Sequence, residues 1–121
     1  MSFDSAIIRC EVILDNARAV ACYIAGMDID AYIADRTTVD AVERCLERIS
    51  EASRKLGPEA EQLAPAEPWR QIKDLGNALR HEYHKVRTSE IWEIATRDLP
   101  SLKADVEKAV AKLRGQGRQN S

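Results

Sequence analysis

Four polar side chains in one short stretch are the strongest candidates for chemistry in this sequence. They are Asn77, Arg80, His81 and His84, which occupy positions i, i+3, i+4 and i+7. On a helix this spacing places all four on one face, and Tyr83 borders that face. A histidine exchanges protons near neutral pH, while an arginine binds a phosphate through two hydrogen bonds and stabilises added negative charge. The pattern therefore suits phosphodiester cleavage.

The same pattern has simpler interpretations. A polar stripe near the end of a helix is typical of a solvated surface, and Tyr83 would then cover only the edge of the core. A metal site that begins with His81 and His84 would need further ligands, which Glu51 or Glu82 would have to supply through folding. Two histidines at this spacing are common by chance, and the sequence contains no His-Glu-x-x-His motif or glycine-rich phosphate loop. We therefore expect neither a metal nor a cofactor.

Composition indicates a small helical domain. The chain has 121 residues, a formal net charge of −2, and only 5 glycines and 4 prolines, too few turn residues for a fold of many β-hairpins. The longest uncharged apolar run, Ala19–Met27, is far shorter than the ~20 residues that cross a bilayer. Cys10, Cys22 and Cys45 are odd in number, without Cys-x-x-Cys spacing, and are expected to be small core residues. A reduced, cytoplasmic protein without an export signal is the expectation.

Apolar residues that recur every three or four positions predict the helices that would position the site. The first helix extends from about residue 4 to Gly26, and residues 27–36 form one short helical turn and a connection. The second begins at a capping box made by Thr37 and Asp40 and ends at Gly57-Pro58.

Two further segments complete the pattern. The third helix has Pro68 in its first turn and directs an apolar stripe inward: Trp69, Ile72, Leu75, Leu79 and Tyr83. The fourth is capped by Thr88 or Ser89, carries Trp92 into the core, breaks or kinks near Asp98 because of Pro100, and continues to about Leu113. These segments predict an all-α fold, an antiparallel up-down bundle of four to five helices formed by residues 1–114. Residues 115–121 have no apolar side chain and are expected to form a mobile tail.

The segment from Trp69 to Trp92, WRQIKDLGNALRHEYHKVRTSEIW, resembles the signature region of the HepT-like family, small all-helical proteins of the wider HEPN superfamily. Upstream, Ile49–Ala52 resembles the family's Ile-Gly-Glu-Ala segment, with Ser50 at the position where glycine is usual. Downstream, the resemblance continues through Asp98–Leu102. These segments occur in the family's order and cover most of the chain.

The resemblance implies a metal-independent ribonuclease that acts as a toxin and is paired with a minimal nucleotidyltransferase antitoxin. The family's catalytic motif is an arginine, four to six further residues, and then His-x-Tyr, which His81, Glu82 and Tyr83 match. Asn77 matches the asparagine that comes after the family's arginine, but the arginine position itself holds Gly76. Arg80 lies about one helical turn from Gly76 and could place a guanidinium nearby.

The resemblance also implies a mechanism and partners. The 2′-hydroxyl of RNA would attack the adjacent phosphate, with His81 as base or acid, Arg80 and Asn77 stabilising the phosphorane, and Tyr83 orienting the imidazole or the substrate. The antitoxin would silence the toxin by attaching AMP to Tyr83, since the added charge and bulk would block RNA entry. Two copies of the chain would form a homodimer with one shared cleft, which concentrates positive charge in an acidic chain.

The sequence supports three hypotheses, in this order. The first is a ribonuclease toxin. The second is a binding protein that retains the fold, the dimer and the affinity for RNA or the nucleotidyltransferase but has lost cleavage, and Gly76 favours it. The third is a structural interaction protein whose polar stripe is a dimer surface.

Overall fold

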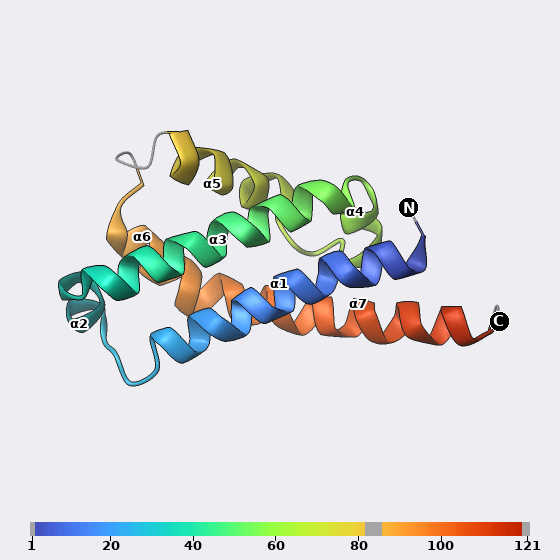
Figure 1. The fold of residues 1–121 in the computed structure, drawn as a ribbon, viewed down its shortest axis with the longest axis horizontal. Coiled ribbons are helices and arrows are strands. Elements are labelled where there is room, and N and C mark those ends of the chain that lie inside the picture. Colours follow the sequence, from blue (N-terminus) through green and yellow to red (C-terminus); the bar gives the residue numbers. More distant parts are fainter. Residues whose placement is uncertain (1, 82–85, 120–121) are drawn as a thin grey trace.

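The computed structural model describes residues 2–81 and 86–119, and all regular secondary structure in these two ranges is helical. Four longer helices are α1 (Phe3–Tyr23), α3 (Arg36–Leu56), α5 (Trp69–His81) and α7 (Leu99–Gln119). They lie side by side in the spatial order α5, α3, α1, α7, each antiparallel to its neighbour (Figure 1). The short helices α2 (Ile29–Ala34), α4 (Glu59–Leu63) and α6 (Thr88–Glu93) belong to the connections. The predicted all-α antiparallel bundle is confirmed.

The core lies along the central pair α1 and α3. Fully buried side chains on these two helices include Ile13, Val20, Val42 and Ile49, and Val106 joins them from α7. This is the arrangement that the apolar stripes predict, because each stripe covers about one face of its helix. Within the described part of the chain, no helix combines the length and the apolar character that spanning a bilayer requires.

The start of α3 differs from the sequence prediction. The helix begins at Arg36, and the carboxylate of Asp35 accepts a hydrogen bond of 3.1 Å from the backbone nitrogen of Thr38. The capping box of Thr37 and Asp40 is therefore wrong, because Asp35 caps the helix first and Asp40 pairs instead with Arg36 at 3.1 Å. The end of α3 at Gly57 is as expected, and Gly57 has a φ of +62°, which suits glycine.

The segment from α6 to α7 also differs. Thr88 is the first residue of α6, after Arg87, so the predicted caps at Thr88 or Ser89 are wrong. Between α6 and α7 the chain forms a π-helical segment, Ile94–Asp98 (η2), in which the backbone nitrogen of Leu99 donates to the carbonyl of Ile94. The predicted break near Asp98 takes this form: the π-helical segment ends at Asp98, and α7 begins at Leu99, directly before Pro100, which has no N–H to donate.

The C-terminal helix continues further than its apolar stripe. The stripe ends at Leu113, whereas α7 includes Gly115 and extends to Gln119. The segment from residue 115 to 119 is thus helical where the sequence indicates a tail. The domain boundary at residue 114 and the mobility of residues 115–121 stay predictions.

Three other side chains refine the predicted core. Trp69 is buried, and its indole nitrogen donates to the carbonyl of Ala64 at 2.9 Å, which fixes the start of α5. Trp92 is only partly buried and packs against Tyr32 with ring centroids 5.2 Å apart. Cys10 and Cys45 are core residues as expected, but Cys22, the second-last residue of α1, is exposed.

Helices α3 and α5 approach each other closely at Ser50 and Gly76, both buried. A Cβ atom added to Gly76 would lie 2.0 Å from Ser50 Oγ and 2.3 Å from Ser50 Cβ. Rotation of the serine could relieve the first overlap but not the second, so the two helices would have to separate. The Ser50 hydroxyl donates to the carbonyl of Lys73 on α5 at 3.1 Å, so this buried polar group is satisfied.

We expect Gly76→Ala to lower the free energy of unfolding by about 1–3 kcal/mol, the typical cost of overpacking. In a Ser50→Gly background the same change should be neutral or stabilising by up to about 1 kcal/mol, because space is available and alanine favours helix. Urea denaturation of the four combinations measures both effects. Gly115→Ala is the control, since nothing lies within 4 Å of an added Cβ there. Equal losses in both backgrounds would show that Ser50 is not the obstacle.

Candidate functional site

The last two turns of α5 lie beside α3, and polar side chains from both helices meet there. Ser50 and Gly76 are in contact, so exposed residues close to them on each helix lie at the edge of the same interface. Glu51 and Arg54 come from α3, and Asn77 and Arg80 come from α5. We call these four residues the polar cluster.

One hydrogen bond and two ion pairs connect the polar cluster. Arg54 Nη2 donates to Asn77 Oδ1 at 2.9 Å. Glu51 Oε2 lies 3.8 Å from Arg54 Nη1 and 3.9 Å from Arg80 Nη2. A single carboxylate oxygen is therefore almost equidistant from two guanidinium groups that come from different helices. It marks a point where an anion is favoured.

The polar cluster is open to solvent and carries a net positive charge. The side chains of Glu51, Arg54 and Arg80 are 43%, 41% and 38% exposed. Ion pairs with this exposure contribute little to stability, about 0–1 kcal/mol each. Two arginines and one glutamate leave one positive charge in excess, so an anion could replace the carboxylate between the guanidinium groups at small cost.

The structure brings together some of the sequence-predicted residues. Asn77 and Arg80 share the exposed side of α5, and Glu51 contacts Arg80, although as an ion-pair partner and not as a metal ligand. His81 is exposed and is the last residue of α5. Tyr83 and His84 lie outside the described residues. Within the described ranges, no three residues of the types His, Cys, Asp or Glu are grouped so that they could hold a metal ion.

Sequence reasoning missed Arg54. It precedes Asn77 by 23 positions, and nothing in the sequence states how two antiparallel helices are aligned. Its only local signal is the spacing from Glu51, three residues earlier, which is common on solvated helix faces. The contact of Ser50 with Gly76 belongs to the packing of α3 on α5 that brings Arg54 to the site.

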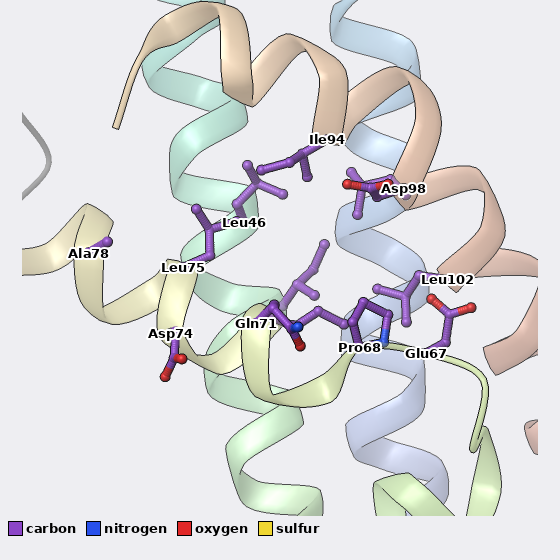
Figure 2. Close-up of a pocket in the computed structure, with 13 residues that line it drawn as sticks. Leu46, Glu67, Pro68, Gln71, Asp74, Leu75, Ala78, Ile94, Asp98 and Leu102 are labelled. Carbon is purple, nitrogen blue, oxygen red and sulfur yellow. The ribbon is translucent and has the colours of Figure 1, made fainter. Parts of the chain in front are cut away.

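A separate cavity of about 360 Å³ opens along α5 between α3 and the η2–α7 segment. Figure 2 shows Leu46, Leu75 and Ile94 around its apolar floor, and Asp74 at the outer edge. Glu67 and Asp98 complete an acidic rim, and none of the lining residues is a lysine or arginine. Neither Asn77 nor Arg80 lines this cavity. An anionic ligand is therefore attracted to the polar cluster and repelled by the cavity.

The rim contains a carboxyl group with a perturbed pKa. Burial, above all, and a hydrogen bond with Asp105 raise the pKa of Glu67 to about 7. The charges of Asp105 and Asp98 act in the same direction, while a 3.0 Å hydrogen bond from the Ser101 hydroxyl opposes them. Glu67 therefore exchanges its proton near neutral pH, at a contact between the start of α5 and α7.

Known proteins that are similar to this chain have names that refer to ribonucleases. The family described as "Ribonuclease HepT-like" matches residues 13–109. A Methanocaldococcus jannaschii protein named "Putative RNase" is 33% identical over 95 residues, 78% of this chain and 87% of the relative. A Thermococcus cleftensis protein named "Probable ribonuclease HepT" is 36% identical over 77 residues, 64% of this chain and 70% of the relative. No solved structure matches the chain significantly.

We expect the protein to become more stable as the pH falls from about 8 to about 5. In this range the folded chain binds a proton at Glu67, whose pKa is raised from 4.5 to about 7, while the unfolded chain releases it. Glu67→Gln should remove most of this dependence and raise the melting temperature at the alkaline end. Melting curves across this pH range test it, with Glu61→Gln as the control, because Glu61 is an exposed glutamate on α4. Parallel pH profiles for wild type and Glu67→Gln would contradict the prediction.

Proposed function

This chain belongs to the ribonuclease HepT-like family, and we propose that it is a metal-independent endoribonuclease and the toxin of a toxin–antitoxin pair. The observation that carries the proposal is the exposed face of α5, where Asn77, Arg80 and His81 occur at helical spacing. These are the residue types that cleavage of a phosphodiester next to a 2′-hydroxyl needs. The positive charge beside them supports an anionic substrate.

The reaction proceeds by internal transfer at phosphorus. His81 accepts the proton of the RNA 2′-hydroxyl, and the oxygen attacks the adjacent phosphorus to form a phosphorane. Arg80 and the amide NH₂ of Asn77 stabilise the added negative charge on the phosphoryl oxygens. The bond to the 5′-oxygen then breaks, this oxygen takes a proton from the protonated imidazole of His81 or of its counterpart in the second copy, and a 2′,3′-cyclic phosphate remains. The nucleophile is supplied by the RNA itself, so no activated water is required.

The hydrogen bond between Arg54 and Asn77 supports this role of Asn77. It occupies the amide oxygen and thereby fixes the orientation of the side chain. The amide NH₂ is a donor and suits a phosphoryl oxygen. A side chain that is oriented before substrate arrives requires less reorganisation in the transition state.

We further propose a homodimer in which two copies of α5 border one cleft. Each chain contributes one His81 and one Arg80, so pairing doubles both the acid–base groups and the positive charge along the RNA path. The chain as a whole has a net charge of −2, and a local concentration of arginines is therefore needed for RNA to bind.

Silencing by a nucleotidyltransferase partner completes the proposal. Tyr83 lies two positions after His81, and a phenolic oxygen can accept an adenylyl group. The attached AMP would add a negative charge and a bulky nucleotide near the imidazole. Both effects oppose the entry of an RNA strand.

A second function is favoured by one specific observation. Ser50 fills the space into which a side chain at Gly76 would project, so this chain has no arginine at the position where its family usually carries one. A protein that binds RNA or the nucleotidyltransferase without cleaving RNA would fit this loss. Cleavage assays separate the two functions.

We expect the purified protein to cleave single-stranded RNA in the presence of EDTA. His81→Ala should reduce the rate by about a hundredfold or more, the usual contribution of a general acid or base. Asp74→Ala, on the cavity side of the same helix, is the matched control and should retain the wild-type rate. Loss of cleavage in EDTA would contradict metal independence. RNA binding without cleavage by the wild type would favour the second function.

Co-expression with the partner nucleotidyltransferase should increase the intact mass of the chain by one adenylyl group. Peptide mass spectrometry should locate the group on Tyr83, and modified protein should no longer cleave RNA. Tyr83→Phe is the control and should keep its unmodified mass, because it lacks the accepting oxygen. The same mass increase in both proteins would show that another residue is the acceptor.

A further inference from the structure

The proposed reaction has only one guanidinium, that of Arg80, to stabilise the phosphorane. The family pattern places an arginine at the position of Gly76, but a Cβ atom there would lie 2.0 Å from Ser50 Oγ. Arg80 alone supplies a guanidinium from α5 to the polar cluster. A phosphorane carries more negative charge than a phosphodiester, so a second guanidinium beside the first would strengthen its stabilisation.

Arg54 on α3 is placed to be that second group. Its Nη2 donates to Asn77 Oδ1, and its Nη1 faces the same oxygen of Glu51 that Arg80 faces. These contacts direct the guanidinium across the helix interface toward α5. Without them, the flexible side chain of a surface arginine would extend into solvent. With its side chain 41% exposed, Arg54 remains accessible to a strand that lies along α5.

The carboxylate of Glu51 shows where the anion would bind. Glu51 Oε2 is 3.8 Å and 3.9 Å from the nearest guanidinium nitrogens of Arg54 and Arg80, a separation that is longer than a direct hydrogen bond. A phosphate has several acceptor oxygens and can bond both fork-shaped guanidinium groups at closer range. Such an anion would displace the glutamate, whose ion pairs are weak because they are exposed.

We propose that Arg54 and Arg80 form a clamp from two helices for one RNA phosphate, and that Glu51 occupies the clamp until RNA displaces it. This proposal rests on the ribonuclease function and adds a phosphate-binding residue from α3. Arg54 replaces the guanidinium that cannot project from position 76. Glu51 then acts as an internal competitor of the substrate.

The first test measures binding of an RNA oligonucleotide with 2′-O-methyl groups, which cannot undergo the internal attack. Arg54→Gln should weaken binding about tenfold and reduce the slope of log affinity against log salt by about one, as expected for the loss of one phosphate contact. Lys55→Gln is the matched control, because it removes an equal charge from the next residue of the same helix. Its effect on affinity should be much smaller. Equal effects of the two variants would overturn the clamp.

A second variant distinguishes the clamp from a purely structural connection between the helices. Glu51→Gln should tighten binding of the same oligonucleotide several-fold, because it removes the competing charge. If Glu51 and Arg54 only hold α3 to α5, Glu51→Gln would leave affinity unchanged or weaken it, which would overturn the proposal. Melting temperatures of all variants verify that each one folds. Arg54→Lys should restore part of the affinity that Arg54→Gln loses, since it retains the charge but not the fork.

Cleavage assays with the same variants keep the two proposals separate. If the wild type binds the modified RNA but does not cleave ordinary RNA, the ribonuclease function fails while the clamp can still be measured. If the wild type cleaves and Arg54→Gln cleaves as fast as Lys55→Gln, the clamp fails while the ribonuclease function stands. A wild type that binds no RNA would overturn both.

Discussion

The direct contact of Ser50 with Gly76 is the constraint on which the rest of the site depends. Absence of a Cβ at residue 76 lets α5 lie against α3 at the distance of a serine side chain, and the hydroxyl of Ser50 bonds to the α5 backbone at the same point. This contact helps to set the axial alignment of α5 relative to α3. Asn77 and Arg80 therefore meet Arg54 and Glu51, and not residues one turn away.

The same contact explains how the chain departs from its family. The resemblance to the family implies glycine at the position of Ser50 and arginine at that of Gly76, so that the small residue would lie on α3 and the large one on α5. In this chain the small residue is Gly76 on α5, and the side chain of Ser50 on α3 fills the space between the two helices. Side chains at residues 50 and 76 would occupy the same space between α3 and α5. A large residue at one of these positions therefore requires a small residue at the other. The exchange removes a guanidinium from α5, while Arg54 brings one from α3 to the same surface.

Periodicity predicted the architecture because each helix buries one face, and the apolar stripes of α1, α3, α5 and α7 are regular. It also placed Asn77, Arg80 and His81 on one exposed side of α5. The capping residue of α3 was predicted wrongly, because Asp35 precedes Thr37 and caps the helix first. The interruption near Asp98 was predicted from Pro100, but its π-helical form was not. Arg54 could not be predicted, because its place depends on the alignment of two helices, which is set by a tertiary contact.

The acidic cavity and the polar cluster lie along different sides of α5. One side of the helix is therefore negatively charged and the other positively charged. Carboxylates occur on one flank, and two guanidinium groups border the other. A polyanionic strand that diffuses toward the helix is repelled from the first flank and attracted to the second. An approaching polyanion is therefore rotated so that it first meets the flank with the arginines.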